Sequence, residues 1–497
     1  MKRRFLNILK KIKEDRLIET IFVVALAGIL IYSLFCDPII GKCDNGDFER
    51  MYGLGGLYNT GKSYDEIFDY RVHRFYLVNR LTLLQPWGPN WVFGVLIAKI
   101  CVFLTLPITA DINQLFNLSY QTIVYASLFV IAMLEIMKYN KISKPIKVVL
   151  GIYIILFFTD FNYISYFNSF FGEAATTVFF FLFIGVTLNL IAREKPKKWH
   201  MIVFFISSAA FLTSKTQQLP LLIFMIIIFI SIYYYYKEFR KLTLIAALII
   251  VNLCGIVYIS INNHTNMNNM YQAVFDGILV GSKTPEKDLE ELGIDKKYAY
   301  LRNYGFYSKD NPVDTVGEIM KNDVYSKMSS MKVLVFYLKH PDRMWEKIEC
   351  SAKYAYDFFE VEPSNFEKGK DWSGKWVNTF RVHLAKQTPQ IHKNVFVFLV
   401  FSILYFIICL WYLIKDKRRE SRLLSLLCIF ILATGASQAV LPIIGSGRAD
   451  LGKHIYLMNL SYDIMFGVAL IWILSNIGKL IGKTNLFKRT NRDINSK

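Results

Sequence analysis

The chain has 497 residues, of which 54% are hydrophobic and 16% aromatic, and its mean hydropathy is positive. Apolar runs this long and this frequent exclude an ordinary soluble protein and indicate a polytopic membrane protein. The formal net charge of +19 does not indicate a nucleic-acid partner, because the basic excess lies in short segments between the apolar runs.

Ten apolar runs are predicted to cross the membrane as helices, which gives an all-α polytopic fold with both termini in the cytoplasm. The runs are 18–36, 118–137, 146–160, 174–192, 200–214, 219–236, 242–261, 395–414, 423–444 and 455–477. The first follows a basic N-terminus and lacks a small-residue cleavage site, so we expect an uncleaved signal anchor. The third and fifth are short for a bilayer that requires about 20 residues.

The segments that this topology places in the cytoplasm are basic. They are 1–16, 138–147, 193–198, 237–241, 415–422 and 478–497. Together they hold 29 Lys and Arg residues against 7 Asp and Glu residues, which is more than the whole net charge. This is the positive-inside pattern expected of a multi-pass plasma-membrane protein, and it also favours contact with anionic membrane lipids.

The apolar run 91–107 is an eleventh candidate for a span. If it crossed the membrane, every later loop would change sides. The basic segments 138–147 and 415–422 would then lie outside, against the positive-inside rule. We therefore expect this run to form a re-entrant or interfacial helix.

Two long segments are predicted on the exterior side of the membrane. The first, 37–117, contains an amphipathic stretch at 64–84 that suits the membrane surface. The second, 262–394, is long enough for a small packed domain and shows helical spacing at 317–339 and 343–359. The predicted organisation is an N-terminal membrane module, an exterior, mainly helical domain and a C-terminal membrane module with a basic tail: 1–261, 262–394 and 395–497.

Several familiar sites are absent from the sequence. The seven cysteines have no metal-ligand spacing, although Cys43 and Cys350 both fall in predicted exterior segments and a disulfide between them is left open. There is no Walker loop, Rossmann fingerprint, H-E-x-x-H or G-x-S-x-G motif. Ion-coupled transporters usually carry charges at mid-span, whereas here they collect at the exterior ends of spans, with Asp463 the main exception.

Acidic residues are crowded directly after the first span. Interface anchors are usually Trp, Tyr, Lys or Arg, so Asp44, Asp47 and Glu49 need another explanation. If this segment is a helical turn, Asp44 and Asp47 share a face. Low dielectric and neighbouring acids would raise the pKa of such a carboxylate, which could then act as a general base toward a hydroxyl, while Arg50 orders the acids or binds an anion. The alternative is a solvated loop with a turn at Gly46.

Two further charges lie at the exterior ends of later spans. Glu173 opens a span that is otherwise uncharged, and it is either a second functional acid or a residue favoured there by the helix dipole at ~0.3–1 kcal/mol. Lys215 lies at the end of the fifth span, and Gln218 lies three residues after it. Lys215 is either a phosphate ligand or a lysine that extends its ammonium to the interface.

The last exterior loop gathers Arg448, Asp450, Lys453 and His454 among three glycines. Glycine permits close backbone approach, and the cations suit a phosphate or pyrophosphate. The alternative interpretation is a tight turn with interface anchors.

Together these short motifs resemble those of the type C glycosyltransferase superfamily of polytopic membrane enzymes, and most of all the bacterial hexose transferases of glycan biosynthesis. The likeness rests on Asn45–Arg50, Tyr166–Glu173, Lys215 with Gln217 and Gln218, and Asp450–His454. It extends over most of the chain in topology but only over these short segments in motif.

The resemblance implies an inverting hexosyltransferase whose site faces the extracytoplasmic side. Its catalytic base would be Asp47, with Asp44 in reserve and Glu173 as a second acid. The donor would be a polyprenyl-phosphate sugar, and the acceptor a cell-envelope glycan or a lipid-linked glycan. Protein mannosyltransferases carry a paired Asp-Glu, which here is separated by Phe48, so a protein acceptor is in doubt.

The resemblance and the charges together suggest how the donor phosphate is held. Its implied ligands are Arg50, Lys215, Arg448, Lys453 and His454. Further candidates for the site are Glu49, Gln218 and Asp450. No cofactor is expected for a monophosphate donor, and dependence on a divalent metal is left open.

Two other functions are compatible with the same residues. A transporter or flippase of a lipid-linked sugar would use the same basic surface to hold phosphate. A polysaccharide polymerase or ligase with a pyrophosphate-linked donor would use the several cations at 448–454.

Overall fold

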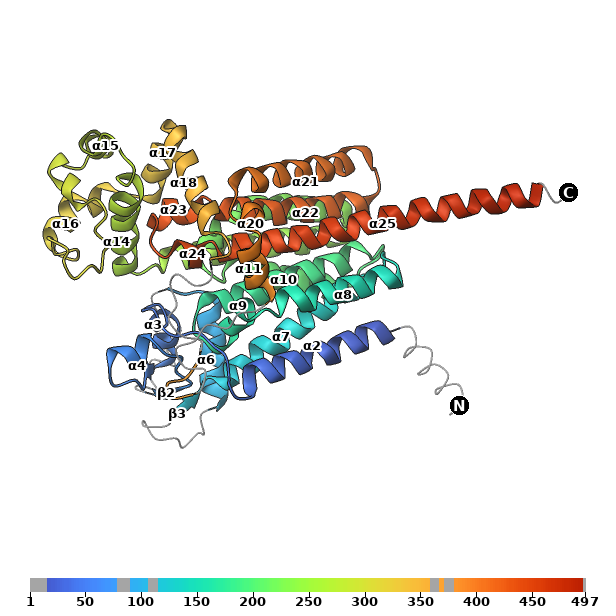
Figure 1. Ribbon diagram of the computed structural model, residues 1–497, viewed down its shortest axis with the longest axis horizontal. Coiled ribbons are helices and arrows are strands. Elements are labelled where there is room, and N and C mark those ends of the chain that lie inside the picture. The colour runs from blue at the N-terminus through green and yellow to red at the C-terminus, as the bar shows by residue number, and fades with distance from the viewer. Residues whose placement is uncertain (1–15, 78–89, 106–114, 358–365, 371–379, 495–497) are drawn as a thin grey trace.

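The computed structural model describes residues 16–77, 90–105, 115–357, 366–370 and 380–494. Its long helices run side by side along one axis (Figure 1). The described parts of the segments 37–117 and 262–394 gather at one end of this bundle, which we call the loop end. The first described helix starts, and the last one ends, at the opposite end of the bundle.

In the described part of the chain, ten bundle helices run alternately toward and away from the loop end. They are α2 (Leu17–Phe35), α7 (Ser119–Met137), α8 (Lys144–Phe158), α10 (Gly172–Ile191), α11 (Lys198–Leu212), α12 (Leu222–Tyr235), α13 (Arg240–Ile259), α21 (Val395–Lys415), α22 (Arg419–Gln438) and α25 (Tyr456–Ile494). Each coincides with one predicted span, so the predicted all-α polytopic membrane fold is confirmed.

Not all ten helices have the length of a membrane span. Within the described ranges, eight are long and apolar enough to cross a membrane, or nine if α8 and its bent continuation are counted as one span. The remaining helix, α11, has 15 residues. The sequence predicts that α8 and α11 are short, and α12, with 14 residues, reaches the length of a span only together with the turn before it, as Thr216–Tyr235.

The bend after α8 has a local cause. Asp160 follows α8, and its carboxylate accepts a hydrogen bond from the backbone N–H of Asn162 at 3.0 Å, which starts the short helix α9 (Phe161–Ile164). The chain turns by 64° at this break and continues into η2 (Ser165–Asn168). This segment delivers the chain to the first turn of α10, where Glu173 lies.

Helix α10 is the central helix of the bundle and packs against α7, α11, α22 and α25. Gly185 lets α10 approach α7 closely, because a Cβ at that position would lie 2.9 Å from the carbonyl oxygen of Ala132. On another face, the ring of Phe180 stacks on Phe211 of α11 at 4.6 Å between centroids. Burial on all sides holds the first turn of α10 in place.

The segment after α2 contains a small sheet that the sequence pattern does not predict. Its antiparallel strands lie in the order β1 (Leu57–Asn59), β2 (Arg74–Leu77) and β3 (Leu115–Asn117). Strands of three or four residues are too short to show alternation in sequence. The short helices here are α3 (Glu49–Tyr52), η1 (Gly53–Gly55) and α4 (Tyr64–Phe68), and residues 78–84 of the predicted amphipathic stretch lie outside the described residues.

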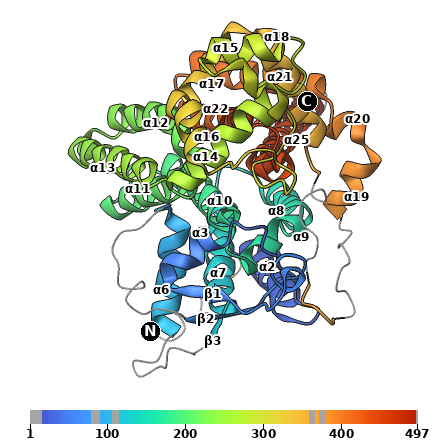
Figure 2. The same ribbon diagram turned by 90° about the vertical axis from the view of Figure 1, so that its left-hand side faces the viewer.

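The run 91–107 forms the helix α6 (Phe93–Thr105), and residues 106–107 lie outside the described residues. At 13 residues, α6 is about 20 Å long, which is too short to cross a bilayer. It lies across the direction of the bundle helices rather than along it (Figures 1 and 2). This placement agrees with the predicted interfacial or re-entrant helix.

The segment 262–394 is helical wherever it has regular structure in the described residues. Its helices are α14 (Asn263–Tyr271), the π-helix η5 (Gln272–Ile278), α15 (Pro285–Leu292), η6 (Lys296–Leu301), α16 (Glu318–Asp323), η7 (Tyr325–Lys327), α17 (Ser330–Lys339), α18 (Pro341–Tyr354), α19 (Phe380–Gln387) and α20 (Pro389–His392). The predicted helix at 317–339 is thus divided into three pieces. Cys350 lies on α18 and does not form a disulfide with Cys43.

Four short helices complete the described structure. They are η3 (Thr216–Leu221), which leads into α12, η4 (Lys237–Phe239), which precedes α13, and the pair α23 (Leu441–Ser446) and α24 (Leu451–His454) between α22 and α25. Both α23 and α24 lie at the loop end (Figure 1).

A buried ion pair joins the second loop segment to the bundle. Arg381 of α19 donates hydrogen bonds to both carboxylate oxygens of Asp463 of α25, at 2.9 and 2.7 Å, and the two side chains are 1% and 0% exposed. The hydroxyl groups of Tyr163 and Tyr356 donate to the same carboxylate at 2.7 and 3.0 Å. The mid-span charge of Asp463 is therefore matched by partners from three other segments of the chain, as a buried charge requires.

We predict that Asp463→Asn strongly destabilises the protein, by about 3–5 kcal/mol, because it leaves the guanidinium of Arg381 buried without a counter-charge. Thermal unfolding in detergent measures the effect. Replacing both partners, as Arg381→Met with Asp463→Leu, should recover much of the lost stability. The control is Glu290→Gln, which removes an ion pair with Lys296 in which both side chains are more than half exposed. An unchanged melting temperature for Asp463→Asn would contradict the prediction.

Candidate functional site

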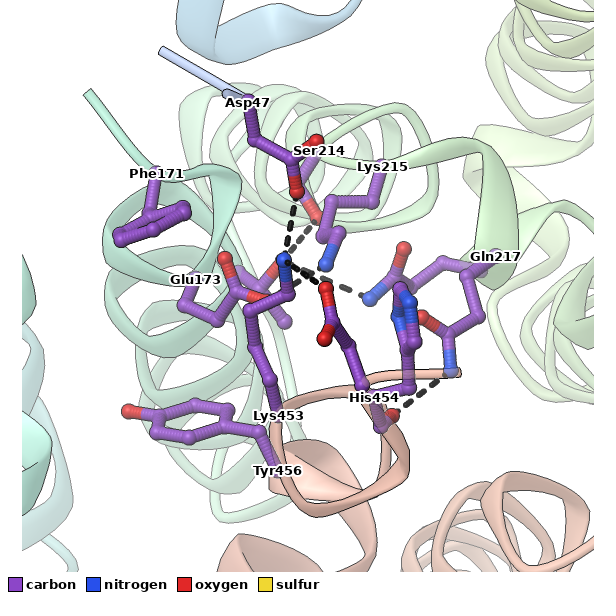
Figure 3. Close-up of polar contacts among 12 residues, drawn as sticks. Asp47, Phe171, Glu173, Ser214, Lys215, Gln217, Lys453, His454 and Tyr456 are labelled. Carbon is purple, nitrogen blue, oxygen red and sulfur yellow. Dashed lines mark hydrogen bonds and ion pairs between the residues drawn. The ribbon is translucent and has the colours of Figure 1, made fainter. Parts of the chain in front are cut away.

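Four segments that are far apart in sequence meet at the loop end of the bundle. They are the loop that precedes α3, the first turn of α10, the turn between α11 and η3, and the region of α24. Figure 3 shows that their side chains converge, with the carboxylate of Asp47 and the ammonium groups of Lys453 and Lys215 close to Glu173. We call these four residues the charged cluster.

Asp47 forms the best-defined contact of the charged cluster. Its Oδ2 lies 2.6 Å from Nζ of Lys453, and its Oδ1 lies 3.2 Å from the guanidinium of Arg50. Asp47 is held there by its neighbour Phe48, which is 1% exposed and packs edge-on against Phe171 at 4.7 Å. A buried aromatic residue thus sets the direction in which the acid points.

The ion pair fixes the ionisation of both partners. Burial alone would raise the pKa of Asp47, but Lys453 and Arg50 hold it well below its usual range. For Lys453, burial opposes the charge, while Asp47, Asp450 and Glu173 raise the pKa above the ordinary value. Both groups are therefore charged throughout the physiological pH range. The expectation of a raised pKa for Asp47 is wrong, because the cation outweighs burial.

Glu173 and Lys215 form a second ion pair beside the first. The carboxylate of Glu173, whose side chain is 3% exposed, lies 2.6 Å from Nζ of Lys215. The preceding residue is Gly172, where a Cβ would lie 2.8 Å from Cγ of Lys215. A side chain at this position would force the lysine to shift where it crosses the start of α10 to reach the acid.

Asp44 has a different environment from Asp47. Its Oδ1 accepts hydrogen bonds from the backbone N–H groups of Gly46 and Phe48, at 2.8 and 3.1 Å, and the chain turns at Gly46 with a φ of 96°. The two acids therefore do not share a face of a helical turn. Burial raises the pKa of Asp44 to about 6, although the two N–H groups oppose the shift.

His454 and its neighbours form the polar edge of the cluster. Gln217 donates a hydrogen bond from Nε2 to the backbone oxygen of His454 at 2.9 Å, and it also contacts the side chain of Gln438. Burial, with help from Lys453 and Lys215, lowers the pKa of His454 well below its ordinary value. The imidazole is therefore neutral and does not supply the positive charge that the sequence suggests.

Three of the predicted residues lie apart from the ion pairs of the cluster. Arg448 pairs with Asp276 of η5 at 3.3 Å, and Gln218 donates to the hydroxyl of Thr176 at 3.4 Å inside the bundle. Glu49 is exposed on α3. None of the three makes a contact with Asp47 or Lys453 in the described structure.

Asp450 lies at the margin of the cluster. One of its oxygens is 3.6 Å from Nζ of Lys453 and 3.5 Å from the side-chain nitrogen of Asn45. Its φ is 48°, a left-handed conformation that Asp tolerates better than most residues. The side chain is nearly half exposed, so it contributes to the open side of the cluster.

Two residues that contact predicted site residues were not themselves predicted from the sequence. Gln438 lies near the end of α22, is fully buried and leaves its Nε2 without a hydrogen-bond partner. The signal for it is an amide near the end of an apolar span. Asp276 lies on a π-helix, and π-helical turns are frequent at functional sites, but nothing in its sequence neighbourhood points to it. Across the described residues, no group of three His, Cys, Asp or Glu side chains is placed to hold a metal ion.

The fold and the cluster define a multi-pass α-helical membrane protein with a charged site at one end of its bundle. The chain belongs to the family described as the YfdI N-terminal transmembrane domain, whose model matches residues 4–495. This match covers nearly the whole chain, including both loop segments. No curated protein and no solved structure matches the chain.

We predict that Asp44→Asn stabilises the protein increasingly as the pH rises. The folded-state pKa of about 6 exceeds the unfolded value of 3.8, so stability is lost as the pH rises through this range and the buried carboxyl ionises. Asn keeps the oxygen that accepts from Gly46 and Phe48 but cannot ionise. The difference in melting temperature between variant and wild type should be larger at pH 8 than at pH 5. A difference that is the same at pH 5 and pH 8 would contradict this assignment, and Asp310→Asn, which changes an exposed acid elsewhere, serves as the control.

Proposed function

We propose that the protein is an inverting glycosyltransferase that moves a hexose from a polyprenyl-phosphate sugar to a cell-envelope glycan acceptor on the extracytoplasmic side of the plasma membrane. The observation that carries the proposal is the contact between Asp47 and the buried ammonium of Lys453, beside the ion pair of Glu173 with Lys215. Such a site has two cations that can bind a phosphate and two carboxylates that can accept a proton, and it lies at one end of the bundle of membrane helices.

The charge balance suggests how binding of the donor would change the pKa of Asp47. A buried ammonium requires a counter-ion, and Asp47 and Glu173 fill that role in the structure. The donor is a phosphodiester with one negative charge, which competes with these carboxylates for Lys453 and Lys215. Once the phosphate takes Lys453, the pKa of Asp47 rises and the carboxylate becomes a better proton acceptor.

The reaction then needs one base and one stabilising charge. The acceptor hydroxyl gives its proton to Asp47 while its oxygen forms a bond with the anomeric carbon. The bond from that carbon to the phosphate oxygen breaks, and polyprenyl phosphate leaves with the electron pair on the opposite face, so the configuration inverts. The leaving phosphate gains negative charge, which Lys453 and Lys215 stabilise. Phosphate is a weak base, so no general acid is required.

The positions of the cations favour a monophosphate donor over a pyrophosphate donor. The polymerase or ligase alternative depends on several cations at 448–454. Arg448 is instead paired with Asp276, and His454 is neutral. Of the predicted cations of that loop, only Lys453 brings a positive charge to the cluster. In competition assays, polyprenyl monophosphates should therefore inhibit transfer more strongly than the corresponding diphosphates.

We predict that Asp47→Asn lowers the transfer rate on the order of 10²–10⁴-fold, because the acceptor hydroxyl loses its general base. Donor binding should persist, since Lys453 and Lys215 remain. Transfer from a radiolabelled polyprenyl-phosphate hexose measures the effect, and the matched control is Glu49→Gln, which changes an exposed acid two residues away. Wild-type transfer by Asp47→Asn would contradict the assignment. A purified protein that transfers no sugar but moves such lipids across vesicles would establish the transporter alternative.

A second prediction concerns the pH dependence of kcat/KM. In the wild type, Lys453 and Arg50 keep the pKa of Asp47 low, so Asp47 stays ionised above pH 5 and causes no loss of activity as the pH falls to 5. Lys453 lowers the pKa of Asp47 more than Arg50 does. In Lys453→Gln this effect is lost, so the pKa of Asp47 should rise and the activity should fall with decreasing pH within the measurable range. Both proteins are compared in the Asp44→Asn background, so that Asp44 does not titrate. Identical profiles would rule out control of Asp47 by Lys453.

A further inference from the structure

Lys453 lies on a helix that is too short to hold a buried charge in place by itself. Helix α24 has four residues, and the side chain of Asp450 before it does not cap the backbone N–H groups of its first turn. A single turn forms too few hydrogen bonds to offset the entropy lost in ordering it. Residues 439–454, which we call the Lys453 loop, must therefore be held from outside. The second loop segment packs against this loop, with α18 on α24 and both α14 and η5 on α23 (Figure 1).

The contact of η5 with the Lys453 loop joins two glycines. Gly447 has a φ of 62°, which residues with a Cβ rarely adopt. A Cβ there would collide with the carbonyl oxygen of Gln272 and would lie 2.8 Å from the amide nitrogen of Gly277. In the other direction, a Cβ on Gly277 would lie 3.0 Å from Cα of Gly447. Because all of these are backbone atoms, none can move aside without a shift of η5 or of the loop.

Helix α18 holds both η5 and the Lys453 loop. Its Arg343 donates a hydrogen bond to the carbonyl oxygen of Ile278, the last residue of η5. The carbonyl groups at the end of a helix need donors from elsewhere, and this guanidinium supplies one. Further along α18, the hydroxyl of Ser351 donates to the carbonyl oxygen of Ala439, the first residue of the loop, at 2.7 Å. The two partners of the glycine contact are thus fixed to the same helix.

Two further contacts lie closer to Lys453. Arg448 pairs with Asp276 of η5 at 3.3 Å. Gly452 lies directly before Lys453, and a Cβ on it would lie 2.9 Å from the carbonyl oxygen of Asp357. The residue next to the buried lysine is therefore itself in backbone contact with the second loop segment.

We propose that the second loop segment positions the ammonium of Lys453 against Asp47, and that Gly447 and the pair of Arg448 with Asp276 are the positioning residues through which it acts. A buried ion pair offsets the cost of desolvation only when its geometry is good, so a small shift of the loop would weaken it. The consequence for sugar transfer rests on the proposed function, whereas the position of Lys453 relative to Asp47 does not.

The first test measures the contact of Asp47 with Lys453 without an assay of activity. A double-mutant cycle compares the melting temperatures in detergent of the wild type, Asp47→Asn, Lys453→Gln and the double variant. In the wild-type background the two shifts should be strongly non-additive, because the side chains are 2.6 Å apart. In the Gly447→Ala background the non-additive part should fall to about half of its wild-type size or less, because the displaced ammonium pairs poorly.

The control and a milder variant complete the cycle. Gly293 belongs to the same segment and has a φ of 77°, but a Cβ there would meet nothing within 4 Å. Gly293→Ala therefore adds backbone strain without touching the Lys453 loop, and its cycle should keep the wild-type non-additivity. Arg448→Gln removes the ion pair with Asp276 without backbone strain. It should reduce the non-additivity in part, and Arg448→Lys should restore it.

The second test uses the proposed reaction. Gly447→Ala should lower kcat/KM on the order of 10²-fold, as expected for a misplacement of about 1 Å. In the Asp44→Asn background, its activity should also fall with decreasing pH, as in Lys453→Gln. The substitution leaves the other charged and titratable side chains around Asp47 unchanged. They are Arg50, Glu173, Lys215, Asp450 and His454.

The outcomes separate this inference from the proposed function. If the wild-type non-additivity persists in both Gly447→Ala and Arg448→Gln, the positioning role is wrong, whatever the transfer rates are. An equal loss in Gly293→Ala would assign the effect to general strain and would also overturn the role. If the non-additivity is lost as expected but the wild-type protein transfers no sugar, the positioning role stands and the transferase function is wrong.

Discussion

The site depends on one constraint, which is that the ammonium of Lys453 is buried and must be neutralised. Its side chain is only 3% exposed, and a bare charge in such a place would cost several kcal/mol. The counter-charge comes from Asp47, some 400 positions earlier in the chain. This one contact ties the first loop to the last, sets the ionisation of both groups and gives an incoming anion a cation to compete for.

The rest of the fold holds Asp47 and Lys453 in the positions that this contact requires. On one side, α10 is buried on all faces and holds Glu173 at its first turn, while Phe48 and Phe171 lock the loop that carries Asp47. On the other side, α25 follows Lys453 directly and is joined by Asp463 to Arg381 of α19. Aromatic packing and close backbone approach join helices within the bundle.

If the protein is the transferase proposed above, the paired charges would also limit hydrolysis of the donor. A carboxylate that is bound to a lysine is a poor base, so the site would stay inactive toward water until a phosphate displaced the carboxylate. Under this proposal, donor binding would require only an exchange of partners at Lys453 and Lys215. The acceptor would then meet a base that the donor has already released. In this scheme, the order of binding follows from electrostatics alone.

The sequence by itself determined the positions and alternating direction of the bundle helices, because each is an apolar run whose flanks carry a charge bias. It also marked Asp47, Glu173, Lys215 and Lys453, because a charge at the end of an apolar run stands out. Only the tertiary structure decided which of these charges meet. Arg448 pairs with Asp276, burial keeps His454 neutral, and the pKa of Asp47 is lowered rather than raised. Those outcomes depend on distances between segments hundreds of residues apart, which no local pattern records.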